Sequence, residues 1–120
     1  MKQFVSCNIE TLACSGETAW VISIPTESVP DTALLLSGLL YGKVKLVKFA
    51  DKSRTAVLSA STNSYSLNLC DTQIIVTRIW LEALLVMLLD VCLNGWKDTA
   101  HLDQDFEDVS VTVAVLPPER

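Results

Sequence analysis

The apolar run from Ile74 to Leu93 constrains the fold of this chain more than any other feature. Its only charged residues are Arg78, Glu82 and Asp90. At 3.6 residues per turn, all three fall on one half of a helix surface, and the rest of the circumference is apolar. We therefore expect water to reach only a narrow stripe of this helix, while the remainder of the chain covers it.

Two features place this helix inside a domain rather than in a membrane. Glu82 lies near the middle of the run, and a charge at the bilayer centre costs on the order of 2.5–3.5 kcal/mol. The flanks also resemble ordinary helix ends, because Asp71 is a good N-cap residue and Asn94-Gly95 supplies a left-handed residue after the last turn. We predict a buried helix between Asp71 and Gly95 and no membrane association.

Alternation of apolar and polar residues predicts strands on both sides of this helix. Such patterns occupy Val5–Ile9, Trp20–Ile24, Lys43–Phe49, Arg54–Ala60, Tyr65–Leu69 and Val109–Val115. A short leucine-rich helix from Thr32 to about Tyr41, which Gly42 stops, interrupts them. The order ββ-α-βββ-α-β(β) predicts one α+β domain over residues 1–120. In it, a mostly antiparallel sheet of about six strands carries one long apolar helix and one short helix packed on one face.

Composition restricts the partners and the compartment. The net charge of −5 argues against nucleic acid as a ligand. Half of the residues are hydrophobic, and the mean hydropathy of +0.38 raises the expectation that a partner or a second copy covers apolar surface. The first residues lack the apolar run of a signal peptide, so we expect a cytoplasmic protein with reduced, partly buried cysteines. These are Cys7, Cys14, Cys70 and Cys92, and a Cys7–Cys14 disulfide across a hairpin is the alternative.

The strongest polar feature is the segment 98–108, which holds five acidic residues, no basic residue and the only histidine. If extended, it places His101, Asp103 and Asp105 on one face and Leu102 and Phe106 on the other. Carboxylates beside aromatic residues suit the recognition of a basic protein surface. The predicted partner-binding residues are Trp96, Asp98, His101, Asp103, Asp105, Phe106, Glu107 and Asp108.

Other interpretations of the charged segments stay open. His101, Asp103 and Asp105 could ligate a divalent ion, so a metal-binding or metal-stabilised protein is the first alternative. Their spacing matches no known metal motif, and we assign neither a metal nor a cofactor. A solvated edge strand is the simplest interpretation of the segment. A homo-oligomeric structural or accessory subunit is the second functional alternative.

Basic residues gather in the predicted second hairpin, against a single acidic residue. They are Lys43, Lys45, Lys48, Lys52 and Arg54. Such a run is typical of a solvated hairpin face, and it could also bind an acidic partner. An ion pair between Arg78 and Glu82, one helical turn apart, is expected on the surface of the long helix.

Motifs for catalysis are missing. The chain has one histidine, and no serine lies in a G-x-S-x-G elbow. Neither a Walker A loop nor a G-x-G-x-x-G loop is present. We therefore predict a protein without enzymatic activity.

One resemblance adds to this prediction. The end of the chain, a long apolar helix followed by His101-x-Asp103-x-Asp105 and a valine strand, resembles small bacterial immunity proteins, which neutralise a toxin by binding it. The resemblance implies an inhibitor-type binding module whose partner is a toxin or another basic protein. It transfers no functional residue to this chain.

Overall fold

The computed structural model describes residues 4–14, 17–70, 72–106 and 109–118 of an α+β chain. Its strands are β1 (Phe4–Ser6), β2 (Asn8–Cys14), β3 (Glu17–Ile24), β4 (Leu46–Ala50), β5 (Thr55–Ala60), β6 (Tyr65–Leu69), β7 (Thr72–Val76), β8 (His101–Phe106) and β9 (Val109–Val115). Its helices are the 3₁₀ helix η1 (Thr26–Ser28) and the α-helices α1 (Val29–Leu40) and α2 (Arg78–Asn94).

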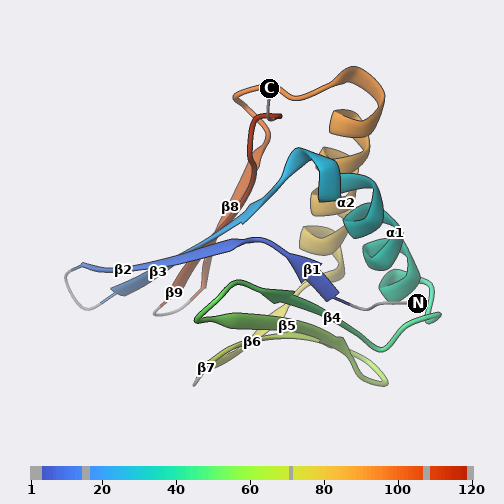
Figure 1. Cartoon of the computed structure of the whole chain (residues 1–120). Coiled ribbons are helices and arrows are strands. Elements are labelled where there is room, and N and C mark those ends of the chain that lie inside the picture. Colours follow the sequence, from blue (N-terminus) through green and yellow to red (C-terminus); the bar gives the residue numbers. More distant parts are fainter. Residues whose placement is uncertain (1–3, 15–16, 71, 107–108, 119–120) are drawn as a thin grey trace.

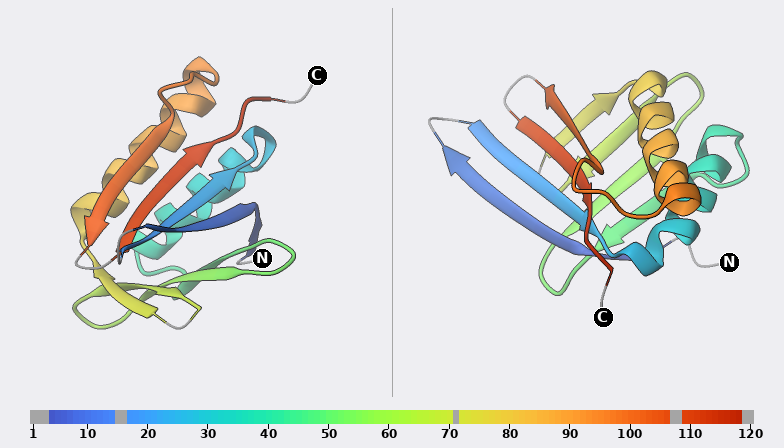
Figure 2. Two further views of the ribbon diagram at one scale, coloured as in Figure 1. Left: turned by 90° about the vertical axis from the view of Figure 1, so that its left-hand side faces the viewer. Right: turned by 90° about the horizontal axis from the view of Figure 1, so that it is seen from above.

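The strands form two mixed sheets. One sheet has the order β1-β4-β5-β6-β7, and the other has the order β2-β3-β9-β8. Each contains one parallel pair, β1 with β4 and β3 with β9, and the other neighbours are antiparallel. Helices α1 and α2 pack against each other and occupy the angle between the two sheets (Figure 1 and Figure 2). Within the described ranges, each sheet therefore has one face toward the helices and one face that no helix covers.

A single apolar core fills the space between the helices and the inner sheet faces. The central residues of α2 that face this core, Leu81, Leu84 and Leu88, have no solvent exposure. The strands contribute every second side chain, as the buried alternation Val109, Val111, Val113 and Val115 in β9 illustrates. Burying a side chain of this kind stabilises the fold by about 1.5–3 kcal/mol, so this core holds the sheets and helices together.

Local residues set the start of α2 and the C-terminal ends of both α-helices. Thr77 precedes α2 in an extended conformation, and its hydroxyl accepts a hydrogen bond from the backbone N–H of Trp80 at 3.0 Å. After α1 and after α2 the chain turns through Gly42 and Gly95, whose φ angles are 74° and 86°. Only glycine adopts such angles without strain, so the sequence itself ends these helices.

The chain passes from one sheet to the other at Cys7, between β1 and β2. The Cys7 N–H donates to the Ala50 carbonyl at 3.1 Å, and the buried thiol lies 3.7 Å from the same oxygen. Burial raises the pKa of Cys7 to about 11. Because β2 is extended from Asn8 to Cys14, the two cysteines lie roughly 20 Å apart along the strand, far beyond disulfide reach. The alternative of a Cys7–Cys14 bridge is therefore wrong.

Asp51 joins the two sheets at this crossing. Its carboxylate accepts backbone hydrogen bonds from Ser53 and Arg54 in the β4–β5 turn, both at 2.8 Å, and from Ile9 of β2 at 2.9 Å. The bonds from the Ser53, Ile9 and Arg54 N–H groups hold the pKa of Asp51 below its ordinary value of 3.8. This turn residue therefore ties the start of β2 to the five-stranded sheet.

The prediction of one mostly antiparallel sheet of about six strands is wrong. Val5, Cys7 and Ile9 alternate without interruption, yet the chain changes sheets at Cys7 within that pattern. The parallel pairs join segments far apart in sequence, as Trp20 opposite Val111 shows. Alternation reveals which side chains share a face, but it does not specify the partner strand.

The first part of the predicted long helix is a strand. Ile74 and Val76 belong to β7, an edge strand that pairs with β6, and α2 begins at Arg78 after the Thr77 cap. The predicted cap, Asp71, lies outside the described residues. Three consecutive β-branched residues favour a strand, and a short apolar run cannot be assigned to strand or helix by periodicity alone.

Water also reaches much more of α2 than a narrow stripe. Ile79, Val86 and Leu93 are 78%, 66% and 81% exposed. The expectation that other structure covers the apolar circumference is therefore wrong on this face. Cys92 on α2 and Cys70 after β6 are exposed free thiols rather than partly buried ones. Within the described residues, no helix has the length and apolar character needed to cross a membrane.

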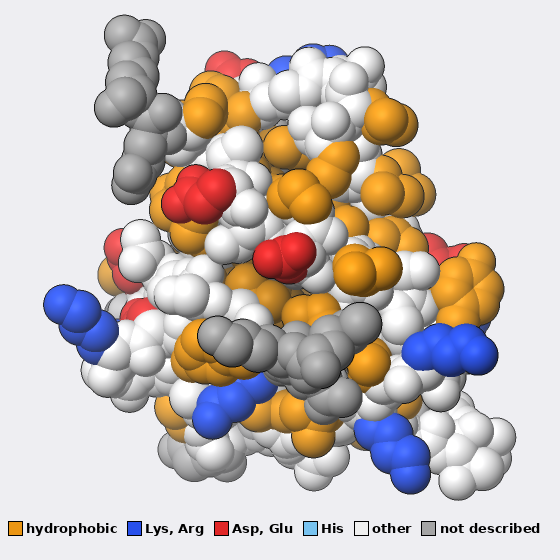
Figure 3. Space-filling view, turned by 45° about the vertical axis from the view of Figure 1, so that its right-hand side comes forward, with side chains coloured by type: hydrophobic (Ala, Val, Ile, Leu, Met, Phe, Trp, Pro, Cys, Tyr) orange, Lys and Arg blue, Asp and Glu red, His pale blue; other side chains and the backbone are white. Residues whose placement is uncertain are grey.

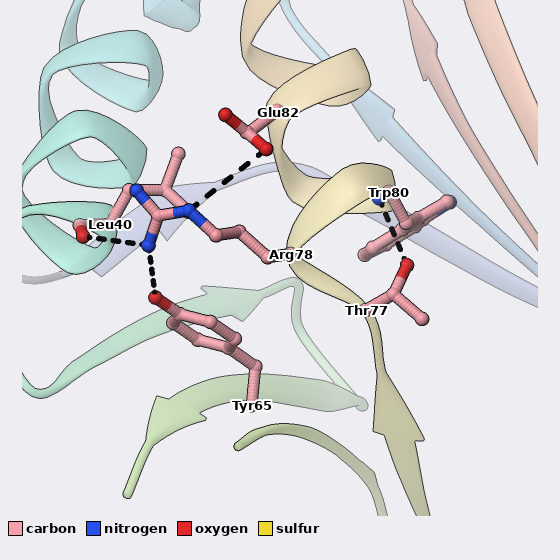
Figure 4. A network of polar contacts seen from close by, with 6 residues as sticks. All are labelled: Leu40, Tyr65, Thr77, Arg78, Trp80 and Glu82. Carbon is pink, nitrogen blue, oxygen red and sulfur yellow. Dashed lines mark hydrogen bonds and ion pairs between the residues drawn. The ribbon is translucent and has the colours of Figure 1, made fainter. Parts of the chain in front are cut away.

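Arg78 fastens the start of α2 to two neighbouring elements (Figure 4). Its Nη1 donates to the Leu40 carbonyl at the end of α1, at 3.3 Å, and to the Tyr65 hydroxyl of β6, at 3.0 Å. Its Nε lies 3.9 Å from a carboxylate oxygen of Glu82, with both side chains about half exposed. This confirms the expected surface ion pair, although such pairs contribute little to stability.

Candidate protein-interaction surface

Strand β8 carries the predicted acidic segment at the edge of the four-stranded sheet. Successive side chains of a strand point to opposite faces. His101, Asp103 and Asp105 are exposed on the outer face, whereas Leu102 and Phe106 are partly buried toward the helices. The left panel of Figure 2 looks onto this outer face, with the helices behind the sheet. The structure therefore brings the histidine and two of the predicted carboxylates into one line.

Strand pairing extends this line into a surface four strands wide. In its central row, Glu10 of β2 lies beside Val21 of β3, which neighbours Thr112 of β9, which neighbours Asp103 of β8. The flanking rows are Asn8, Ser23, Ala114 and His101 on one side and Leu12, Ala19, Ser110 and Asp105 on the other. In these three rows the two central strands present only small or β-branched side chains, and the longer side chains stand along both margins. We call this surface the acidic sheet face.

Charge is divided between the two sheets. Strands β2, β3, β8 and β9 contain four carboxylates, Glu10, Glu17, Asp103 and Asp105, and no lysine or arginine. The strands of the other sheet contain Lys48 and no acidic residue. The remaining basic residues of the second hairpin lie in the loops before and after β4. The acidic sheet face therefore projects a negative potential that no cation within its own strands neutralises.

The Asp103 carboxylate of β8 is held in place but remains accessible. The Thr112 hydroxyl donates to Asp103 at 2.8 Å, which fixes that side chain across the strand pair. His101 Nδ1 lies 3.8 Å from the other oxygen of Asp103, and the side chains are 51% and 65% exposed. Exposed, fixed carboxylates can accept hydrogen bonds from lysine or arginine at little ordering cost.

The two predicted aromatic residues face the interior. The Trp96 indole N–H donates to the Val115 carbonyl at 2.7 Å, so this half-buried side chain ties the α2–β8 connection to the end of β9. Phe106 packs edge-on against Trp80, with ring centroids 6.3 Å apart at 80°. Neither ring is part of the acidic sheet face, and both support β8 from behind.

The other predicted contact residues are not brought onto this surface. Asp98 is exposed in the turn before β8, beyond the end of the sheet. Glu107 and Asp108 lie outside the described residues. In the part of the chain that the structure describes, no group of three or more His, Cys, Asp or Glu side chains is arranged to hold a metal ion. The metal alternative therefore receives no support from the geometry of His101, Asp103 and Asp105.

Glu10 is the functional candidate that the sequence did not reveal. It lies more than 90 residues from Asp103, and only the strand order β2-β3-β9-β8 brings both onto one face. Alternation with Ile9 shows that Glu10 points away from the core. It does not show that β2 shares a sheet with β8.

Comparison with known proteins adds no family: no family model, no curated protein and no solved structure matches this chain. The function therefore has to be argued from the surface itself.

Proposed function

We propose that this protein is a non-enzymatic binding module of the inhibitor or immunity type. It would bind a basic partner protein, such as a toxin, on the acidic sheet face. The observation that carries the proposal is the row Glu10, Val21, Thr112 and Asp103, with a carboxylate at each end and small side chains between them.

Charge supports a basic partner. Carboxylates stand on both margins of the acidic sheet face, so lysine or arginine side chains approaching from either side meet an acceptor. Complementary charge accelerates the encounter and fixes the relative orientation of the two proteins. Because these carboxylates are exposed, the association should weaken as salt concentration rises.

The shape of the face supports protein binding rather than chemistry. The small central side chains Ala19, Val21, Ser110 and Thr112 leave the middle of the sheet flat and half-exposed. His101, the only histidine, is about half exposed at the margin, and its ion contact is with the carboxylate of Asp103. A flat, rigid sheet that needs only complementarity fits an inhibitor better than an enzyme, which encloses its substrate.

A charge reversal on β8 tests the proposal. The double variant Asp103→Lys/Asp105→Lys should fold, because both side chains are exposed, and it should lose the partner that the wild-type protein retains in a pull-down from the source cells. The matched control is Glu27→Lys/Asp90→Lys, which changes the net charge equally on exposed positions of other elements. Proteins retained by the wild type and the control but lost by the β8 variant are the expected result.

Two properties of a retained protein, its charge and the salt dependence of its binding, make the outcome specific. A retained protein should be basic, and its binding should fall steeply with salt when remeasured with the purified pair. Equal retention by all three baits would contradict the assignment of the acidic sheet face. So would a partner whose binding is independent of salt.

A further inference from the structure

Helix α2 exposes a row of apolar side chains to solvent. Ile79, Val86 and Leu93 are the most exposed side chains along it, and Leu89 beside them is 44% exposed. The three residues are separated by seven positions, so each lies only about 20° around the helix from the previous one. Apolar residues seven positions apart form one of the two rows by which helices pack in coiled coils, and Leu89, three residues after Val86, lies in the second row. We call Ile79, Val86 and Leu93 the α2 seam.

The surface around the seam continues onto α1. A surface hollow of about 370 Å³ lies between the two packed helices, and its lining includes Ala33 and Leu34 of α1 and Leu85, Leu89 and Cys92 of α2. Leu34, at its rim, is 60% exposed. Figure 3, which looks toward the helices, shows hydrophobic side chains spread over this face with a few carboxylates between them.

The area of this apolar face approaches what a partner would bury. Each large side chain of the seam and of the hollow's rim exposes on the order of 100 Å², so the seam, Leu89 and Leu34 together leave several hundred Å² uncovered. A patch of that size is at the upper limit for a monomer. With the polar residues around it, it approaches the roughly 800 Å² per partner of a standard interface.

The spacing of the seam fits a second copy of the same chain. Consider a second α2 helix that runs antiparallel to the first, with the two-fold axis at Val86. A residue that lies n positions after Val86 is then level with the residue that lies n positions before Val86 in the other copy. Ile79 then meets Leu93 of the second copy, Val86 meets Val86, and Leu93 meets Ile79. Because the three residues are evenly spaced, every residue of the seam then meets an apolar residue of the other copy, and both copies use the same patch, as in an isologous two-fold contact.

The charges beside the seam permit this arrangement. Glu82 and Asp90 lie four residues before and after Val86, about 40° to either side of it. In the two-fold pair, Glu82 of one copy is level with Asp90 of the other copy. The two side chains lie on opposite edges of the interface, where water still reaches them. Arg78 is engaged with Leu40 and Tyr65 of its own chain. No charged side chain therefore has to be buried on the axis.

We propose that the α2 seam is the interface of a homodimer in which two α2 helices pack antiparallel about Val86. This surface lies on the helices, away from the acidic sheet face, so the dimer leaves that face free. The inference does not depend on the proposed function.

Sedimentation of the purified full-length chain tests the dimer. At micromolar concentrations the wild type should sediment at twice the chain mass of 13.2 kDa. Val86→Asp places two carboxylates against each other on the axis and should weaken self-association on the order of 100-fold or more. Leu12→Asp is the matched control, because Leu12 is 61% exposed on β2 and should leave the dimer intact. Circular dichroism checks that both variants remain folded.

A charge pair at the same position tests the two-fold axis. Val86→Asp alone and Val86→Lys alone should each be monomeric, whereas an equimolar mixture should dimerise, because the axis brings the two residues together. A monomeric wild type overturns the proposal. So does a Val86→Asp variant that remains a dimer, or a mixture that does not associate.

Discussion

The same substitution at two tryptophans, Trp80→Phe and Trp96→Phe, should have different consequences for stability. Trp80 is 5% exposed, and its indole N–H is buried and donates to no atom among the described residues. The Trp96 indole N–H donates to the Val115 carbonyl at 2.7 Å. Both changes remove one N–H and part of one ring. Their difference therefore compares the loss of an unpaired indole N–H with the loss of a paired one.

The magnitudes follow from these environments. At position 80, the smaller ring leaves on the order of 40 Å³ empty, which costs about 1 kcal/mol. It also removes an unpaired buried donor whose desolvation costs about 1–3 kcal/mol. Trp80→Phe should therefore range from neutral to about 2 kcal/mol more stable. At position 96, the loss of the bond and of ring contacts should destabilise the protein by about 1–2 kcal/mol.

Urea unfolding followed by far-ultraviolet circular dichroism measures both values without relying on tryptophan fluorescence. We expect Trp96→Phe to be less stable than Trp80→Phe by at least about 1 kcal/mol. If Trp80→Phe loses as much stability as Trp96→Phe, the Trp80 N–H has a partner in solution. The assignment of an unpaired donor beneath β8 would then be refuted.

Three further predictions concern the start of α2 and the crossing between the sheets. Thr77→Ala removes the cap of α2 and should cost about 1 kcal/mol in urea unfolding, whereas Thr77→Ser should retain most of it. Asp51 has a lowered pKa, so the stability that it contributes is present above pH 3.8 and is lost as the pH falls through the lower folded value. Asp51→Asn should flatten this acid dependence, and an unchanged acid profile would contradict the role of Asp51. The thiol of Cys7, with its pKa raised to about 11, should be alkylated at pH 8 far more slowly than the exposed Cys70, as peptide mapping by mass spectrometry would show. Equal rates would argue against its burial.

Local structure could be predicted where the residues themselves determine it. Val109–Val115 alternates perfectly and is β9, and Tyr65–Leu69 is β6. The short leucine helix appears as α1, three residues longer at its start, because Pro30 suits a first helical turn. Each of these assignments depends on neighbours a few residues apart, which a sequence displays directly.

Pairing between distant segments could not be predicted in the same way. The parallel contacts of β1 with β4 and of β3 with β9 determine that there are two sheets, and no local pattern encodes them. For the same reason only part of the candidate surface could be predicted from the sequence. The sequence groups His101, Asp103 and Asp105, but Glu10 reaches them only through two intervening strands. The inward direction of Phe106 follows from alternation, whereas its contact with Trp80 does not.

The register of β8 links the stability of the fold to the proposed binding surface. A slip by one residue would turn Asp103 and Asp105 toward the helices and expose Phe106, because the side-chain period of a strand is two. Two contacts on opposite faces oppose such a slip: the Thr112–Asp103 hydrogen bond outside and the Trp80–Phe106 ring contact inside. Loss of the inner contact should therefore weaken partner binding although Phe106 touches no partner. Phe106→Ala consequently differs from Asp105→Lys in a measurable way, since Phe106→Ala should lower stability and binding together, whereas the charge reversal at Asp105, which is exposed and belongs to neither contact, should lower binding alone.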